Sequence, residues 1–512
     1  MAAGFKLERS KHIPALNLTF EEYVHTSGAK HYHLANDYAE NVFMVAFRTV
    51  PHDSSGGAHI LCGSEKFPVR DPFFLMIRRS LNTFMNAFTT SDYTAYPFAS
   101  QNRKDYFNLL EVYLDAVFFS RLDPLDFSQE GHRVEFQDPG DSDSPLVYKG
   151  VVYNEMKGDT SSPVSMLYHG IQEALYPTST YHYNSGGDPV SIPSLSYEQL
   201  KAFYQSHYHP SNAIFMTFGD LDAATLQQKI ASLALDRLDS SAAPPIAVVP
   251  EVRYKQPVVK ELTYPVDEDD TNGKTHIVLA WLLGKNTDLK MLLRCHLLSD
   301  VLLDTSASPL RQALEKTDLA TAASPMCGFE EDHMEMNFMC GVEGSEPEHA
   351  DAIERLILGV LENVAEQGIP EDLLEAVLHQ LELSQREIGG DGWPYGLQLI
   401  FSCMSAAVHR GDPIGLLDLD TALQELRQEI KDPGFIKRLV RELLLSNSHR
   451  VRVVMKPDRE LASRLIEEEQ TKLEALRTSF SDAERSNVLE LATALKKRQS
   501  QKEDLSLLPQ VA

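Results

Sequence analysis

The sequence predicts two similar α/β units in one chain, followed by a charged helical hairpin. Segments typical of strands alternate with segments typical of helices along both halves of the chain. A stretch rich in Ser, Ala and Pro at 236–250 has no periodicity and separates the halves. The 512 residues also exceed the ~250–300 at which a single core stops growing. We therefore expect domains at 1–240 and 251–460, with a truncated helical connector at 461–512.

The first unit opens with strand-like segments at 30–34 and 41–48, the second rich in Val and Phe. A stretch rich in Thr, Tyr and Phe at 86–100 predicts a strand or hairpin. Helical patterns are found at 72–85, 104–119, 152–175 and 197–207. A strand at 212–219 and an amphipathic helix at 223–233 close the unit.

The second unit repeats this order. Its strands are expected at 275–283, 321–329, 334–341 and 450–455. Its helices are expected at 289–303, 309–316, 348–367 and 370–388, with another beginning near 458. Because both units close with a strand followed by a helix, the pattern suggests an ancient duplication. In the charged tail, Ser481 is placed to cap the second arm of the hairpin.

Composition is that of an ordinary globular protein, with 43% hydrophobic and 24% charged residues. No apolar run reaches the ~18–20 residues that span a bilayer, and no signal peptide is visible. The five cysteines are widely spaced and form no Cys-x-x-Cys pair. Free thiols in a reducing compartment fit this spacing better than disulfides, so we expect a cytoplasmic protein without a membrane partner.

The net charge of −27 argues against a nucleic-acid partner, which would require a basic surface. Two interpretations of the charge stay open. An acidic enclosure would attract cationic peptides. Alternatively, the charge lies on solvated helix exteriors and keeps the protein soluble.

One segment, Gly56-Gly57-Ala58-His59-Ile60-Leu61-Cys62-Gly63-Ser64, resembles the start of the zinc helix in pitrilysin/insulinase-type metallopeptidases (inverzincins). The resemblance is to the presequence-protease branch, whose pattern here is Gly-x-x-His-Ile-Leu-Glu-His-x-x-Leu-Cys-Gly-Ser. Further matches cover essentially the whole chain in one order. They include PVRDPF at 68–73, SLNTFMNAFT at 80–89, KGVVYNEMKG at 149–158 and YHPSNA at 208–213.

This resemblance implies a fold of paired α+β domains, each a largely antiparallel sheet flanked by helices. It also implies that relatives are about twice as long, with two halves that close around an unstructured peptide. The present chain corresponds to the first half and the connecting hairpin. The partners implied are therefore unstructured, cationic peptides and a second half-enzyme.

In the family motif, two His at i and i+4 share a helix face and bind zinc, while the intervening Glu is the general base. By the resemblance, His59 matches the first His and Glu155 matches the distant third ligand. The base and the second His have no counterpart, because five residues of the family pattern are missing between His59 and Cys62. Two ligands without a base cannot support the family's hydrolysis, so we expect no catalytic residue and no family-type zinc site.

Cys62 lies three residues after His59, and thiolate is a good zinc ligand, so a His59/Cys62/Glu155 site is chemically permitted. Gly63 instead favours a helix end at that point, with Cys62 as a small buried residue. His52, His207 and His209 are weaker candidates, because isolated histidines are mostly structural.

By the same resemblance, Asn86, Ala87, Phe88 and Thr89 match the edge strand on which a substrate backbone pairs. The alternative is an ordinary sheet edge. The Gly-rich segment 185–189 is not followed by Lys-Ser/Thr, so a structural turn is favoured over a phosphate-binding loop.

Three functional hypotheses follow. The first is a member of the zinc endopeptidase lineage with an impaired site. The second is a non-catalytic subunit that binds peptides or a partner. The third is a fragment without an independent role.

Overall fold

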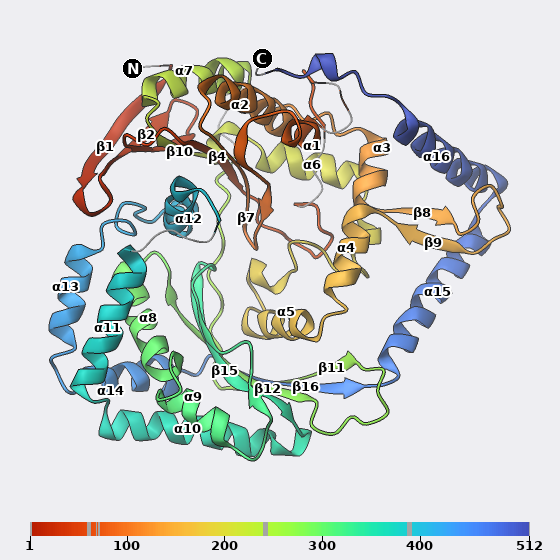
Figure 1. Ribbon diagram of the computed structural model, residues 1–512. Coiled ribbons are helices and arrows are strands. Elements are labelled where there is room, and N and C mark those ends of the chain that lie inside the picture. Colours follow the sequence, from red (N-terminus) through yellow and green to blue (C-terminus); the bar gives the residue numbers. More distant parts are fainter. Residues whose placement is uncertain are drawn as a thin grey trace.

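Two sheets organise the chain, and each is covered by helices on both faces (Figure 1). The computed structural model describes residues 3–58, 63–67, 69, 72–238, 244–386 and 392–510. The first sheet has the order β1-β2-β3-β10-β4-β7-β5, and β6 also pairs with β7. Its strands are β1 (Phe5–Ile13), β2 (Leu18–His25), β3 (Lys30–Ala35), β4 (Asn41–Arg48), β5 (Asn82–Met85), β6 (Phe88–Thr89), β7 (Tyr93–Ser100) and β10 (Ala213–Gly219).

The second sheet has the order β11-β16-β12-β15-β13, with β14 also paired to β15. Its strands are β11 (Val258–Pro265), β12 (Thr275–Lys285), β13 (Ala322–Ala323), β14 (Gly328–Glu330), β15 (Glu335–Ser345) and β16 (Arg450–Asp458). A separate two-stranded hairpin is formed by β8 (Arg133–Phe136) and β9 (Leu146–Lys149).

The two closing strands occupy the same place in their sheets. Strand β10 pairs parallel to β3 and antiparallel to β4. Strand β16 likewise pairs parallel to β11 and antiparallel to β12. The remaining pairs are antiparallel within the described residues. The predicted α+β class with largely antiparallel sheets is therefore confirmed, and the repeated topology fits the duplication.

The outer face of the first sheet is covered by α2 (Arg103–Phe118) and α7 (Ala223–Leu233). The outer face of the second is covered by α8 (Leu289–Leu303), α9 (Pro309–Lys316), α10 (Ala350–Gln367), α11 (Glu371–Arg386), α13 (Asp420–Glu429) and α14 (Phe435–Val440). Smaller helices in the first half are α1 (Pro72–Ile77), α3 (Pro124–Asp126), α4 (Val151–Asp159) and α6 (Tyr197–His207). No described helix has the length and hydropathy of a membrane span.

The inner faces are covered by exchanged helices. Helix α12 (Tyr395–Val408) comes from the second half and packs on the first sheet, where Gly396 leaves no room for a Cβ against Phe218. Helix α5 (Pro163–Leu175) comes from the first half and packs on the second sheet, where Gly170 meets Leu262 in the same way. Both helices lie between the two sheets (Figure 1). The domain limits expected from sequence stay a prediction, because the cores interlock.

Arg48 adds a polar lock to this exchange. Its guanidinium is buried and donates to the carbonyl oxygens of Val408 and Ala407 at the end of α12, at 2.5 and 3.1 Å. A cation is favourable at a helix C-terminus, where unpaired carbonyls gather. Burial nevertheless lowers the pKa of Arg48 to about 10.

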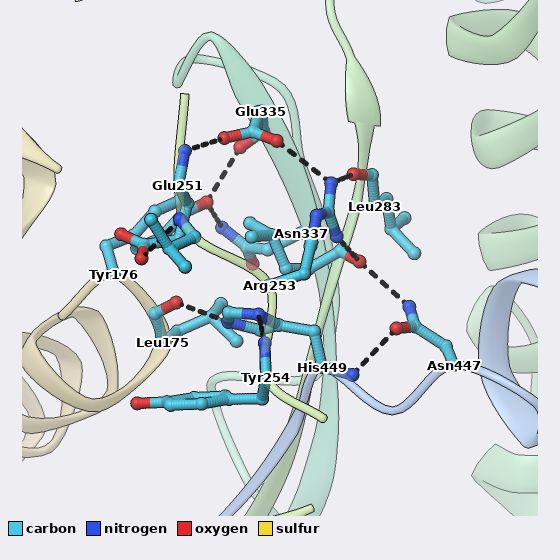
Figure 2. A network of polar contacts seen from close by, with 12 residues as sticks. Leu175, Tyr176, Glu251, Arg253, Tyr254, Leu283, Glu335, Asn337, Asn447 and His449 are labelled. Carbon is cyan, nitrogen blue, oxygen red and sulfur yellow. Dashed lines mark hydrogen bonds and ion pairs between the residues drawn. The ribbon is translucent and has the colours of Figure 1, made fainter. Parts of the chain in front are cut away.

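The segment that enters the second sheet is fastened to both halves (Figure 2). Glu251 accepts bonds from the backbone N–H groups of Thr178 and Ser179, at 3.0 and 2.9 Å. Its own N–H donates to Glu335, at 2.6 Å, and Arg253 reaches the same carboxylate, at 2.9 Å. The polar network therefore ties a loop of the first half to β15 of the second.

The tail folds back on the first half. Helices α15 (Leu461–Ser479) and α16 (Asp482–Ser500) hold the β8–β9 hairpin between them (Figure 1). Leu473 and Val488 pack against Phe136 and Leu146 of the hairpin. The predicted cap is confirmed, because Ser481 and Glu484 form a capping box.

Some expected elements differ from those observed. The helix expected at 72–85 ends at Ile77, because Ser80 Oγ accepts the N–H of Asn82 and turns the chain into β5. The helix expected at 152–175 is two helices, since Pro163 starts a new one behind the Ser162 cap. The strand expected at 321–329 is β13 and β14, separated by a turn in which Cys327 N–H donates to Ser324.

Candidate functional site

Glu155 lies on helix α4, where its side chain is exposed. His59 and Cys62, the other two candidate ligands, lie outside the described residues. Among the residues that the structure does describe, no three His, Cys, Asp or Glu side chains are placed to hold a metal ion. The description of the site therefore rests on Glu155 and on the segments that flank residues 59–62.

The segment that leads to residue 59 is held against a glycine-rich turn. Gly56 has a φ of +75°, and a Cβ on it would lie 2.7 Å from the carbonyl oxygen of Gly186. Ser54 strengthens the contact, because its carbonyl accepts the N–H of Asp188 at 2.8 Å. Only glycine fits this left-handed conformation and this close approach without strain.

The same turn also touches α4. A Cβ on Gly186 would lie 2.9 Å from the sulfur of Met156, the residue after Glu155. Residues 185–189 thus bridge the approach to residue 59 and the helix that carries Glu155. The turn favoured from sequence is what the structure contains, and it acts as a spacer within the site.

On the other side of residues 59–62, the chain is pinned to α2. Ser64 is fully buried and donates to Asp115 at 2.6 Å, and the same carboxylate oxygen accepts the N–H of Lys66 at 2.8 Å. Ala58, before the segment, is also buried. Four residues therefore connect two anchored points, and they contain one His and no Glu.

Other polar groups surround α4. His169 Nε2 lies 3.1 Å from a carboxylate oxygen of Asp159 and 3.3 Å from the amide of Asn184. On the opposite side of the site, Lys157 pairs with Glu469 of α15 at 2.7 Å, so the tail hairpin braces this helix. A His–Asp pair of this kind orients side chains but supplies only two potential ligands.

The remaining histidine candidates differ in surroundings. His207 is buried, stacks on Phe203 with ring centroids 3.9 Å apart, and shares a bond with the Phe203 carbonyl. Burial lowers the pKa of His207. His209 accepts the N–H of Ser211 at 3.2 Å and caps a short turn. Both have structural partners, whereas His52 is exposed.

The predicted edge strand lies at the end of the first sheet. Phe88 and Thr89 form β6 and pair with Ala95 and Thr94 of β7. Asn86 and Ala87 join β5 to β6 and are exposed. Within the described residues, β5 and β6 pair with β7 on one side, and no strand pairs with them on the other.

Sequence reasoning missed the residues that the second half brings to this edge. Trp393 stacks on Phe88 with ring centroids 5.4 Å apart. Deeper between the halves, buried Asp92 accepts from Tyr181 at 2.6 Å and lies 3.2 Å from Nε2 of His409. The pKa of Asp92 is lowered: burial acts to raise it, but its bonds to His409 and Tyr181 outweigh that effect. Partners so distant in sequence leave no local pattern.

Comparison with known proteins gives two domain-family matches. Residues 194–381 match the family described as Peptidase M16 inactive domain, and residues 455–512 match the family of segments associated with subfamily C of the M16 peptidases. The chain is 39% identical over 515 residues to the mitochondrial presequence protease of Xenopus laevis, covering 99% of this chain and 50% of that protein. For presequence protease 1 of Arabidopsis thaliana, chloroplastic/mitochondrial, identity is 37% with 91% and 44% covered. The chain thus spans about half the length of these curated relatives.

Solved structures share the fold. A protease from Helicobacter pylori has a TM-score of 0.67 at 18% identity, covering 86% of this chain and 99% of that one. The first half of the periplasmic protease PqqL from Escherichia coli has a TM-score of 0.60 at 13% identity, with 98% of both chains covered. In complete PqqL the match covers 50% of that chain.

The names of the relatives correct one expectation. A cytoplasmic location was expected from the spacing of the cysteines. The proteins of Xenopus laevis, Xenopus tropicalis and Mus musculus are named mitochondrial, and that of Arabidopsis thaliana is named chloroplastic/mitochondrial. The expectation is therefore wrong, because free thiols are equally compatible with a reducing organelle interior.

Proposed function

Because the chain belongs to the M16 peptidase family, in its presequence-protease branch, we propose that it binds unstructured peptides as one half of a two-half peptidase and does not cleave them through residues 59–62. The observation that carries peptide binding is the sheet edge at β5 and β6, which no other described strand covers. An extended peptide satisfies such an edge by adding a strand to it.

The same proposal excludes zinc hydrolysis by this chain. A catalytic zinc needs three protein ligands, an open position and a base that activates the bound water. The donor set here does not fit, because the family's second His and its Glu have no counterpart between Ala58 and Gly63. Glu155 and His59 alone supply two ligands, and Cys62 as a third would still leave the site without its base.

The test is a binding and cleavage experiment on the purified chain. A fluorescently labelled, unstructured 20-residue basic peptide should change its anisotropy on binding and stay intact by mass spectrometry, with zinc well below one per chain. Two matched peptides carry N-methyl groups on alternate amides, in the two opposite phases. Strand addition uses every second amide, so one methylated phase should lose binding and the other keep it. Equal binding of both phases, or cleavage of the peptide, would contradict the proposal.

The partner proposed is a second half of the same superfamily. This chain matches the first half of PqqL over nearly its whole length, and it covers half of each presequence protease compared. Mixing the chain with a separately expressed second half of the Xenopus laevis relative should give a one-to-one complex by analytical ultracentrifugation. Two unchanged sedimenting species would argue instead for a subunit that binds peptides alone. For its location we propose an organelle, in line with its relatives.

A further inference from the structure

Four aromatic rings from two distant parts of the sequence meet at the β5–β6 edge. Phe84 and Phe88 are stacked on the strands, with ring centroids 6.3 Å apart. Trp393 lies 5.5 Å from the Phe84 ring and 5.4 Å from the Phe88 ring. Phe401 of α12 supports both, 5.5 Å from Phe88 and 5.6 Å from Trp393. The edge therefore carries a fixed aromatic surface, which we call the Trp393 platform (Phe84, Phe88, Trp393 and Phe401).

The platform is ordered by packing yet remains open to water. Trp393 is 42% exposed, whereas Trp281, the other tryptophan of the chain, is fully buried. Leu81, just before β5, is 57% exposed. Large apolar surface in water is unfavourable by about 25 cal/mol per Å², so grouped and exposed apolar side chains beside an open edge mark a binding surface.

The place of the platform selects its ligand. A peptide added to an antiparallel edge presents every second side chain on one face, with Cβ atoms about 4.5–5.5 Å from those of its neighbours. Phe84 belongs to the face of the sheet that α12 covers. Side chains of the added strand on that face would therefore lie against Phe84, Phe88 and the rim of Trp393.

Charge adds a second requirement at the far end of β6. His333 Nε2 lies 3.1 Å from the hydroxyl of Ser91, which places the acidic tip Glu330–Glu331–Asp332 beside the β6–β7 turn. Asp332 is exposed and forms no ion pair with any residue in the described part of the chain. Ser91 follows Phe88 by three residues, or roughly 10 Å along a strand. A basic side chain three positions from the apolar one would face this tip.

We infer that the Trp393 platform is a side-chain subsite for an aromatic or bulky aliphatic residue of an extended peptide, with the acidic tip favouring a basic residue about three positions away. This inference rests on the proposed peptide binding at β5 and β6. It makes the second half of the chain, through Trp393, a determinant of which peptides the first sheet accepts.

Intrinsic fluorescence tests the inference directly, because Trp393 is the exposed member of the two tryptophans. The probe is an unstructured ten-residue peptide with one central Phe and a Lys three positions to each side. Matched peptides replace Phe with Ala, or both Lys with Glu. The Phe peptide should shift the tryptophan emission and bind about tenfold tighter than either matched peptide, as expected when an aromatic pair and a charge pair are formed.

Two variants separate the platform from a general effect. Trp393→Ala should remove the preference for Phe over Ala, while Trp393→Phe should keep most of it. Tyr38→Ala is the control, because Tyr38 is another exposed ring that contacts the start of α12, at Tyr395. It should leave the preference unchanged. Thermal unfolding by circular dichroism checks that each variant is folded.

The outcomes are distinct. If the Phe and Ala peptides bind wild-type protein equally while backbone methylation still weakens binding, the subsite is overturned and the proposed function stands. If no peptide binds, both fail. If Trp393→Ala keeps the Phe preference, the subsite lies elsewhere and the inference is overturned.

Discussion

His449 accepts the backbone N–H of Tyr254 at Nδ1, 2.9 Å away, and its Nε2 lies 2.8 Å from the carbonyl oxygen of Leu175 (Figure 2). An N–H can only donate, so Nδ1 must be unprotonated and Nε2 must carry the hydrogen. The neutral ring thus joins the linker, α5 of the first half and β16 of the second in one tautomer. Protonation at Nδ1 would break the bond to Tyr254.

This geometry predicts an acid-sensitive joint. Burial, and secondarily Arg253, lowers the pKa of His449 below its usual 6.5, although the Leu175 carbonyl, Glu251 and Glu335 oppose the shift. The neutral ring's contribution to stability is complete above about pH 6.5. As pH falls, the unfolded chain gains a proton that the folded chain refuses, so stability is lost down through the folded pKa.

His449→Gln should isolate this effect, because its amide does not titrate and still offers an N–H to Leu175. At pH 8 we expect the variant to be less stable by about 1 kcal/mol in urea unfolding, through the bond lost to Tyr254. The deficit should shrink toward pH 5, since only the wild type weakens there. A constant difference from pH 8 to 5 would show that the ring does not act as described.

The anchor after residue 62 is expected to be strongly coupled. Asp115→Ala leaves the buried Ser64 hydroxyl and the Lys66 amide without their acceptor, so unfolding free energy should fall by about 2–4 kcal/mol. Ser64→Ala removes one bond and should cost about 1 kcal/mol. In the double variant the costs should not add. Glu65→Ala, at an exposed neighbour, is the control and should change stability by less than about 0.5 kcal/mol.

The glycine contact in the site gives a matched pair of substitutions. Gly56→Ala forces a left-handed residue against the Gly186 carbonyl, and we expect a loss of about 2–4 kcal/mol. Gly158→Ala, in α4, meets nothing within 4 Å and should raise stability by about 0.5–1 kcal/mol. Thermal unfolding distinguishes the two by opposite shifts in Tm. Shifts of the same sign would refute the assigned contact.

Restoring the motif tests the cause of the missing metal site. Inserting Glu-His-Ala-Ala-Leu between Leu61 and Cys62 rebuilds the family pattern beside Glu155. Zinc content by inductively coupled plasma mass spectrometry should rise from well below one toward one per chain. The same insertion with Ala in place of its His should stay low. Full occupancy in the unmodified chain would place zinc on His59 and Cys62 after all.

Sequence predicted most of the framework because its strands are apolar and its helices periodic. Strand β4 is buried along its whole length, and α6 begins and ends where its pattern does. Strand β1 escaped notice because it is an edge whose residues between Phe5 and Ile13 are mostly exposed, so no alternation appears. Helix α12 was not assigned, since its apolar surface serves the other half's sheet.

The site was less accessible to sequence reasoning than the fold. The resemblance indicated His59, Cys62 and Glu155, of which the structure describes Glu155, and their roles stay predictions. Its setting depends on contacts that no motif encodes, such as Gly56 against Gly186 and Ser64 on Asp115. Trp393 approaches Phe88 across about 300 residues of chain, a relation that only the tertiary fold creates.

The exchange of α5 and α12 has a consequence for how the protein could be divided. Each sheet borrows a helix to cover one face, so neither half owns a finished interior. Cutting the backbone between the halves should leave them associated and melting in one cooperative step. Produced singly, each half would expose a bare apolar sheet and precipitate. The smallest stable piece of this molecule is thus the pair, and any shortened version must keep both lenders.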